Sequence, residues 1–537
     1  MEPYPGKTNG YLALILHAHL PFVRHPEREQ VLEEDWLFEA ITESYIPLLV
    51  ILQRLRRDGI PFKLTMSVTP SLCAMLNDQL LRARYVGYLE RAIELAEREL
   101  ERNRNHPALR ALSFFYRDRF SECRRWFVDE WSGDLLSVFR QLRESGSLEI
   151  IASAATHGLL PLLLQSPTAA RAQVLIGCDI YREVFGAEPT GFWLPECAFS
   201  PGLESILREA NLRWFVLDAH GLLFGNPQPR QAIYAPCYTP AGPAAYARDR
   251  ASSRQVWSAR EGYPGDPLYR EFYHDIGFEL PISHLWPGTN EADARRFTGL
   301  KYRRVTGGDA DKDWYDPAAA RRRADEHASH FLAERRKQIN ELRTYHWPPI
   351  VVTPFDAELF GHWWFEGPHF LEMFIRKAAC DQRDFALTTP SEYLENNPSQ
   401  QIISPAASTW GENGHLAVWL DQSNSWIYPH LHAAARRMVE MASAHAADAS
   451  ALVERTLRQL VRELLLMQSS DWAFLMKTGT ARQYATQRTT DHILRFNKLY
   501  HQLVDHRIEE NFLSECELRD NLFPDVNWRY YVGNDCS

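Results

Sequence analysis

Carboxylic acids stand directly after two short apolar runs that have the composition of strands. Residues 350–353 lead through Pro354 to Asp356, and residues 191–193 lead through Pro195 to Glu196. In a parallel barrel the catalytic groups lie at the carboxyl ends of the strands, so both segments fit such a site. Each segment alone also fits an acidic turn packed by aromatic residues. Because the same order occurs twice, the catalytic interpretation is favoured.

Indoles accompany both carboxylic acids. Trp193 precedes Glu196, and Trp363 and Trp364 follow Asp356. In glycoside chemistry one carboxylic acid protonates the leaving oxygen while the other attacks the sugar or activates water. The flat faces of aromatic side chains stack on sugar rings. The residue types therefore indicate cleavage or transfer of a glycosidic bond.

Five segments carry a resemblance to a known family. The sequence resembles glycoside hydrolase family 57 and, within it, the α-1,4-glucan branching enzymes. The segments occur in family order and span nearly the whole chain: His17-Ala18-His19-Leu20-Pro21, Ala155-Thr156-His157-Gly158, Trp193-Leu194-Pro195-Glu196, Thr353-Pro354-Phe355-Asp356 and Ser469-Ser470-Asp471-Trp472.

This resemblance implies a retaining double displacement without cofactor or metal. It implies that Glu196 is the nucleophile and Asp356 the general acid/base, and that the partner is an α-1,4-glucan such as amylose or a glycogen-type polysaccharide. The product would be an α-1,6 branch, as in glycogen biosynthesis. The substrate contacts that it implies are His17, His19, His157, Trp193, Arg270, Trp286, Trp363, Trp410, Trp419, Asp471 and Trp472.

Other activities remain open. The family also holds α-amylases, 4-α-glucanotransferases and amylopullulanases, although the chain length, the segment 262–266 (GYPGD) and the SSDW motif favour branching. The H-x-H pattern is also typical of metal-dependent barrel hydrolases and deacetylases. In that case His17, His19, His157 and Asp356 would bind zinc and Glu196 would be a base. A non-catalytic glucan-binding protein is disfavoured because both motif carboxylates are intact.

Composition excludes several classes of partner. The net charge of −10 over 537 residues argues against binding to nucleic acid or to a membrane surface. No run approaches the roughly 20 apolar residues of a membrane span. The eight cysteines include no C-x-x-C pair, which favours reduced thiols and a cytoplasmic protein. The sequence does not decide between a monomer and a dimer.

Apolar runs and helical patterns alternate in the order of a β/α barrel. The residues indicate about six or seven strands, and the resemblance implies seven. We expect an α/β fold: a distorted (β/α)7 TIM-like barrel with a helical insertion and a C-terminal all-α domain. The predicted division is barrel 1–77, helical insertion 78–147, barrel 148–398 with the catalytic carboxylates, and helical domain 399–537.

A long segment rich in Pro, Gly and Ala, residues 227–266, has no clear periodicity. Structureless loops of this length in compact enzymes are commonly functional. We expect this loop to close over the sugar, exclude water and so favour transfer over hydrolysis. Its spacing after Glu196 puts Tyr246 at the tip, with Tyr238 as the alternative. A tyrosine packed on the loop's own prolines is the competing interpretation.

Overall fold

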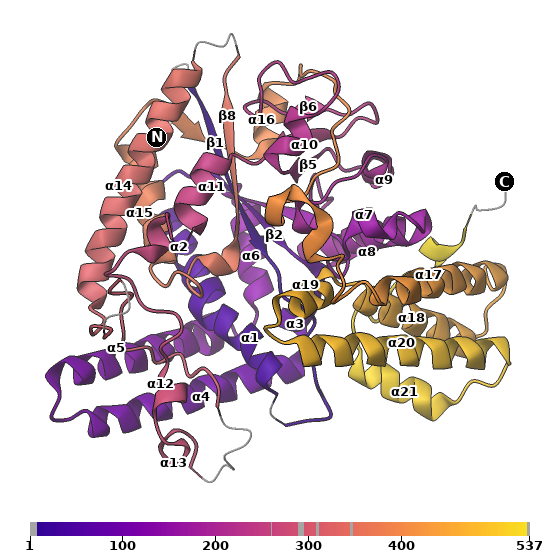
Figure 1. Ribbon diagram of the computed structural model, residues 1–537, viewed down its shortest axis with the longest axis horizontal. Helices are drawn as coiled ribbons and strands as arrows, with labels where there is room; N and C mark the ends of the chain where they lie inside the picture. Colours follow the sequence, from indigo (N-terminus) through magenta and orange to yellow (C-terminus); the bar gives the residue numbers. More distant parts are fainter. Residues whose placement is uncertain are drawn as a thin grey trace.

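A curled parallel sheet occupies the centre of the structure, a computed structural model that describes residues 8–29, 31–258, 260–287, 295–307, 311–343 and 347–533 (Figure 1). Of the nine strands in these ranges, seven run parallel in the order β7–β5–β4–β3–β2–β1–β8. A hydrogen bond of 2.8 Å from Asp249 N to Val352 O connects the two ends of the sheet. The predicted distorted seven-stranded barrel is therefore confirmed. Its strands are β1 (Gly10–Ala18), β2 (Leu64–Val68), β3 (Leu148–Ser153), β4 (Gly191–Trp193), β5 (Trp214–Leu217), β7 (Ala244–Ala247) and β8 (Ile350–Asp356).

Two further strands extend the sheet. β6 (Cys237–Tyr238) pairs antiparallel with β7, and β9 (Phe385–Leu387) pairs parallel with β1. The apolar runs are continuous because both faces of the barrel strands are covered. Along β1, Leu12 and Leu14 pack in the outer core beneath the helices, whereas Ala13 and Ile15 belong to a separate core inside the barrel.

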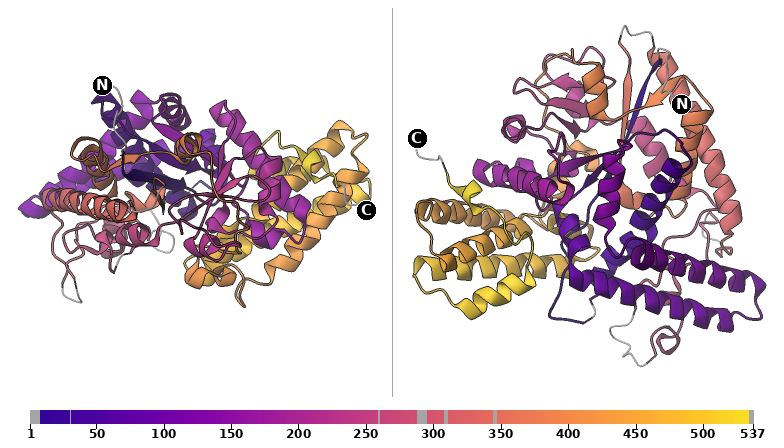
Figure 2. Two further views of the ribbon diagram at one scale, coloured as in Figure 1. Left: turned by 90° about the horizontal axis from the view of Figure 1, so that it is seen from above. Right: turned by 180° about the vertical axis from the view of Figure 1, so that it is seen from behind.

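Helices surround this sheet (Figures 1 and 2). The long helix α14 packs along α15, and the carboxylate of Asp316, the residue before it, caps the N–H groups of Ala318 and Ala319 at 2.9 and 3.1 Å. The surrounding elements are α1 (Leu32–Ala40), the π-helical η1 (Ile41–Tyr45), α2 (Ile46–Arg57), α3 (Pro70–Asn77), α6 (Leu135–Glu144), α7 (Leu160–Leu163), α8 (Pro167–Phe185), η3 (Pro195–Cys197), α9 (Leu203–Glu209), α10 (Ala219–Leu223), α11 (Arg250–Trp257), η4 (Tyr263–Gly265), α12 (Ile276–Glu279), α13 (Ile282–Leu285), α14 (Pro317–Leu342), η6 (Ala357–Leu359), α15 (Gly367–Cys380) and α16 (Pro390–Asn396).

Two groups of helices stand beside the barrel. Between β2 and β3 the chain forms α4 (Gln79–Arg102), α5 (Pro107–Arg124) and the π-helical η2 (Arg125–Glu130), and α4 lies along α5 in both figures. The C-terminal helices gather on one side of the barrel, drawn in orange and yellow in Figure 1. They are η7 (Glu412–Gly414), η8 (Leu416–Val418), α17 (Ile427–Ala444), α18 (Ala451–Met467), α19 (Ser470–Thr478), α20 (Arg482–Val504), α21 (Glu510–Arg519) and η9 (Trp528–Tyr531).

The segment 227–266 is not the structureless loop that its composition predicts. It contains β6, β7, α11 and η4, and β7 is the strand that closes the barrel. Tyr246 is not at a loop tip: it lies in β7, is 1% exposed and donates a 2.7 Å hydrogen bond to Pro390 O. Tyr238 lies half-buried in β6. The prediction failed because β7 is mostly alanine. Its small side chains carry little strand signal, and only packing inside the barrel decides their conformation.

Two expectations from the composition concern the cysteines and membrane-spanning helices. All seven cysteines within the described ranges are free, as predicted. Among the described residues, no helix combines the length and apolar character needed to cross a bilayer.

The hydroxyl of Tyr246 gives a test of this packing. We expect Tyr246→Phe to lower the free energy of unfolding by about 1–2 kcal/mol, because it leaves the buried Pro390 carbonyl without its partner. The matched control is Tyr238→Phe in β6. The hydroxyl of Tyr238 has no hydrogen-bond partner within the described ranges, so a change within about 0.5 kcal/mol is expected. Equal effects in chemical denaturation would contradict the assigned contact.

Candidate active site

Every second side chain of a strand faces the barrel interior, and at the carboxyl ends of the strands these side chains are polar. Ala13 and Ile15 face the interior, so the next residue of β1 on that face is His17. On β8 the interior residue Val352 is followed on the same face by Asp356. Parallel pairing places His17 directly beside Asp356. The apolar strand interior thus leads into catalytic residue types at the carboxyl ends.

The same register brings in two residues that sequence inspection missed. Val216 on β5 pairs with Tyr246 on β7, and Asp218 and Arg248 are the next residues on the same faces. Arg248 Nη1 lies 3.7 Å from Asp218 Oδ2, and Arg250 also bonds Asp218. The sequence held a signal for this pair, because Arg248 directly follows residues 244–247 just as Asp218 directly follows residues 214–217. It was hidden because β7 was not recognised.

Glu196 follows β4 in a left-handed conformation, with φ of 61°, which is uncommon for a residue with a Cβ and is found at functional sites. Its carboxylate accepts hydrogen bonds from Trp410 Nε1 at 2.9 Å and from Ser470 Oγ at 3.2 Å. Both donors come from the C-terminal part of the chain. Ser470, the second serine of the SSDW motif, is thus a direct partner of Glu196 that was not predicted from the sequence.

A chain of hydrogen bonds runs from β1 to Glu196. His17 Nε2 lies 3.0 Å from His157 Nε2, and His157 Nδ1 lies 2.9 Å from Ser470 Oγ. Because Ser470 donates to Glu196, His157 donates from Nδ1 and accepts from His17 at Nε2. Burial lowers the pKa of both histidines well below its usual range, so both are neutral. The chain supplies donors that favour the Glu196 anion.

His19 is the charged histidine of the mouth. Its Nε2 lies 2.9 Å from Asp471 Oδ2, and its Nδ1 lies 3.0 Å from Thr69 Oγ1. Burial alone would lower the pKa of His19, but the Asp471 carboxylate raises it above the usual value. Burial would raise the pKa of Asp471, but His19 lowers it to about 2. The pair therefore places an imidazolium and a carboxylate beside the two candidate catalytic acids.

Burial dominates the pKa values of the remaining carboxylic acids. It raises the pKa of Glu196 to about 7, with the Asp471 and Asp356 charges adding to the effect. It raises the pKa of Asp356 to about 6, against the opposing charge of Arg248. Glu358 accepts hydrogen bonds from the Tyr45 hydroxyl and from His19 N, and burial raises its pKa to about 7. The charge of Asp356 disfavours ionisation of Glu196, so the two acids titrate as a coupled pair.

Three of the predicted substrate contacts are buried indoles. Trp193, Trp419 and Trp472 are 0%, 2% and 0% exposed. Trp193 stacks under His17 at 4.5 Å, and Trp472 Nε1 donates to Leu466 O at 2.7 Å within the helical core. These indoles fill the core that supports the site, and a direct contact of any of them with sugar stays a prediction.

Among the described residues, Arg270 and Trp286 contact partners other than Glu196 and Asp356. Arg270 is buried, with an ion pair of 2.7 Å to Glu43 and with Phe365 against its guanidinium. Its role as a substrate contact stays a prediction. Trp286 follows α13 and contacts Arg296. By contrast Trp410, His19 and Asp471 are brought together around Glu196, while His17 and His157 lie buried behind them.

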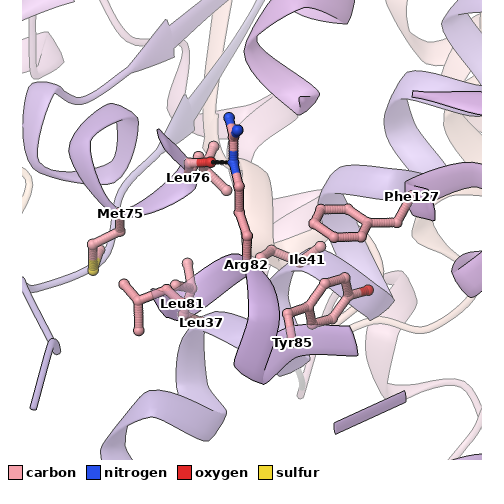
Figure 3. Close-up of a pocket in the computed structure, with 8 residues that line it drawn as sticks. All are labelled: Leu37, Ile41, Met75, Leu76, Leu81, Arg82, Tyr85 and Phe127. Atoms are coloured by element: carbon pink, nitrogen blue, oxygen red, sulfur yellow. Dashed lines mark hydrogen bonds between the residues drawn. The ribbon is translucent and has the colours of Figure 1, made fainter. Parts of the chain in front are cut away.

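A small pocket elsewhere has the wrong chemistry for a sugar site. It lies between α1, η1, η2, α3 and α4, and Figure 3 shows its single charged side chain, Arg82, donating to Leu76 O at 2.7 Å. The other lining residues are Leu37, Ile41, Met75, Leu81, Tyr85 and Phe127. It offers no carboxylic acid.

The histidines are poorly arranged for zinc. Ligand atoms of His19, His157 and Asp471 lie within 4.8 Å of one another. However, the rings of His19 and His157 are stacked, with centroids 3.8 Å apart and planes 20° from parallel. Since the lone pairs of an imidazole lie in its plane, stacked rings do not converge on one ion. Their nitrogens are instead taken by hydrogen bonds within the protein.

Comparison with known proteins now decides the family. Residues 13–276 match the family model described as "Glycosyl hydrolase family 57", and residues 430–531 match "1,4-alpha-glucan branching enzyme, C-terminal". The chain is 35% identical to "1,4-alpha-glucan branching enzyme TK1436" of Thermococcus kodakarensis, over 98% of this chain and 79% of the relative. It belongs to glycoside hydrolase family 57.

Solved structures of the family agree with this fold. "Novel alpha-amylase AmyC" from Thermotoga maritima is similar with a TM-score of 0.91 and 42% identity, covering 98% of this chain and 99% of the other. A "GH57-type branching enzyme" from Pyrococcus horikoshii is similar with a TM-score of 0.87 and 33% identity, covering 98% and 97%. The family assignment predicted from five short segments is confirmed.

The stacked histidines lead to a prediction about metal. We expect exhaustive chelation to leave activity unchanged, because both imidazole nitrogens of His19 and of His157 are already committed to hydrogen bonds and an ion pair. The measurement is turnover before and after dialysis against a strong chelator, with metal analysis of both samples. Loss of activity that stoichiometric zinc restores would support the metallohydrolase alternative.

Proposed function

We propose that the protein is a retaining 1,4-α-glucan branching enzyme. It cleaves an α-1,4-glucan and transfers the released chain to a 6-hydroxyl group, forming an α-1,6 branch. Glu196 is the nucleophile and Asp356 the general acid/base. The natural partner is an amylose or glycogen-type chain.

The observation that carries this proposal is the contribution of the C-terminal part of the chain to the surroundings of the nucleophile. Trp410 and Ser470 both donate to the Glu196 carboxylate, and Asp471 forms the ion pair with His19. Ser470 and Asp471 fall within residues 430–531, which match the C-terminal model of branching enzymes. A hydrolase needs only water as acceptor, whereas a transferase needs a second surface beside the nucleophile. The C-terminal helices supply such a surface.

In the first half-reaction the Glu196 carboxylate attacks the anomeric carbon of the glucan. Asp356 protonates the glycosidic oxygen as that bond breaks, so the reducing-end fragment leaves as an alcohol. This step requires Asp356 to be protonated and Glu196 to be ionised. Donors from Trp410 and Ser470 favour the anion on Glu196.

In the second half-reaction the glycosyl ester is attacked by the acceptor hydroxyl. Asp356, now a carboxylate, removes the proton of the 6-hydroxyl, and the Glu196 carboxylate is released. The two inversions give net retention. Arg248 faces Asp356 with a positive charge and stabilises its anion in this step. Burial of the site limits access of water to the ester, which favours transfer.

An α-amylase is the second candidate. The similarity to the Thermotoga maritima α-amylase, at 42% identity, is the observation that favours it. Both activities use the same glycosyl ester and differ only in whether water or a glucan hydroxyl accepts it. A family 57 4-α-glucanotransferase would use a 4-hydroxyl as acceptor.

We place this activity in the cytoplasm. Its support is the set of free cysteines, seven among the described residues, since oxidising compartments favour disulfides.

The proposal is tested by product analysis. Incubation with amylose is expected to form new α-1,6 linkages in large excess over new reducing ends. The linkages are counted by proton NMR, and the reducing ends by a copper assay on the same samples. Reducing ends that rise without α-1,6 linkages would establish the α-amylase instead. A changed distribution of chain lengths, with neither new α-1,6 linkages nor new reducing ends, would indicate 4-α-glucan transfer.

Substitution of the two carboxylic acids tests their roles. We expect Glu196→Gln and Asp356→Asn each to lower turnover by several powers of ten, because a nucleophile and a proton donor have no local substitute. Circular dichroism and thermal unfolding serve as controls for folding. Product from the parent enzyme is expected to retain the anomeric configuration, and inversion would contradict the ester at Glu196.

The charge of Arg248 leads to a pH prediction. Arg248 lowers the pKa of Asp356, so Arg248→Met is expected to raise it. Because the active form needs a protonated Asp356, the descending limb of kcat/KM should move to higher pH. Arg248→Lys keeps the charge and is the matched control. If Arg248→Met lowers kcat without moving the limb, Arg248 acts only through packing.

A further inference from the structure

A row of aromatic side chains lies on the surface beyond the residues around Glu196, and it includes Trp363, one of the predicted substrate contacts. Trp363 stacks on Phe272, with centroids 4.4 Å apart and planes 22° from parallel. Phe272 contacts Phe297 at 5.7 Å, and Phe297 contacts Phe278 at 5.1 Å. Tyr273 meets the edge of Phe272 at 5.0 Å. These five residues are called the aromatic row.

The row is both firmly supported and open to solvent. Trp363 is 53% exposed and Tyr273 is 71% exposed, so one face of the indole rests on Phe272 while much of the ring is open. From beneath, the ammonium of the buried Lys301 lies 4.1 Å from the Phe272 ring centroid and 4.6 Å from that of Phe297. Cations over aromatic faces hold the rings in place. Contiguous exposed apolar surface of this kind marks a binding surface.

The backbone connects the row to the active site. Trp363 N donates to the carbonyl of Glu358 at 3.2 Å, and the Glu358 carboxylate accepts from His19 N. The turn between them needs Gly361, which has φ of 121° and lies so close to Glu43 that a Cβ would come within 1.8 Å of the Glu43 carbonyl oxygen. The fold therefore fixes the position of Trp363 relative to the residues around Asp356.

The charges around the row argue for a neutral ligand. His362, beside Trp363, lies 2.7 Å from Glu43, and the same glutamate pairs with Arg270. Lys301 is buried under the rings and does not face solvent. A surface for nucleic acid or acidic lipid would need exposed cations. The exposed Arg295 beside Phe278 is held by hydrogen bonds from Nη1 to Gly277 O and Leu280 O, and the exposed aromatic faces suit the apolar faces of sugar rings.

We propose that the aromatic row is a second binding surface for the α-glucan, holding the part of a long chain that extends beyond the sugar units at Glu196 and Asp356. The assignment of the ligand rests on the proposed function. The row would raise the affinity for long chains through multivalent contact and leave binding of short oligosaccharides unchanged. It would thereby contribute to the selection of chain length.

Binding without turnover tests this surface. In a Glu196→Gln background, affinity for amylose is measured by retardation in native gels that contain the polymer, and affinity for maltotriose by calorimetry. Trp363→Ala is expected to raise the dissociation constant for amylose about 5- to 10-fold and to leave that for maltotriose unchanged. Trp363→Phe keeps an aromatic face and should stay close to the parent. Phe224→Ala is the matched control, since Phe224 is 72% exposed and has no ring contact among the described residues.

Three results would overturn the proposal. They are unchanged retardation of Trp363→Ala, an equal loss of affinity for maltotriose, and a change of oligomeric state on gel filtration, which would make the row a subunit contact. The outcome is separate from that of the linkage assay. If amylose gains no branches but Trp363→Ala still weakens retardation, the proposed reaction fails while the binding surface stands.

Discussion

The ion pair between His19 and Asp471 is the contact on which the geometry of the site depends. It joins the end of the first barrel strand to the start of a helix more than four hundred residues later, at 2.9 Å. Separating two buried charges leaves each without a partner, which is costly in a protein interior. Backbone contacts reinforce the pair, since Ser470 N donates to His157 O at 3.1 Å. Ser470 reaches Glu196 because the C-terminal helices are held in this position, whereas Trp410 is held beside Glu196 by its own backbone hydrogen bond to Glu196 O at 3.1 Å.

Charge compensation explains the composition of the barrel mouth. Glu196, Asp356 and Glu358 lie in one buried region; burial raises all three pKa values, and the Asp356 charge raises those of Glu196 and Glu358 further. His19 and Arg248 bring positive charge to the same region. The neutral histidines His17 and His157 add oriented donors without adding charge. A double displacement requires one protonated and one ionised carboxylic acid, and the donors Trp410 and Ser470 favour the ionised form of Glu196.

The indoles divide into two functions that sequence alone does not separate. Trp193, Trp419 and Trp472 are buried and support the walls of the site, whereas Trp410 reaches the nucleophile and Trp363 lies at the surface. A tryptophan beside a motif residue has the same sequence context in either case. Burial depends on which helices pack above it, and that is decided by contacts from distant parts of the chain.

The sequence by itself determined the family, the alternation of strands and helices, and the two candidate catalytic residues. These depend on local patterns: apolar runs of strand length, and carboxylates directly after them. Tertiary structure alone decided that residues 244–247 form the closing strand, that Tyr246 is a core residue, and that Ser470, Arg248 and Asp218 belong to the mouth. Alanine has little preference for strands, so β7 exists because β5 and the barrel interior hold it in register. The partners of Glu196 come from positions more than two hundred residues away, and only the packing of the C-terminal part of the chain against the barrel brings them within hydrogen-bond distance.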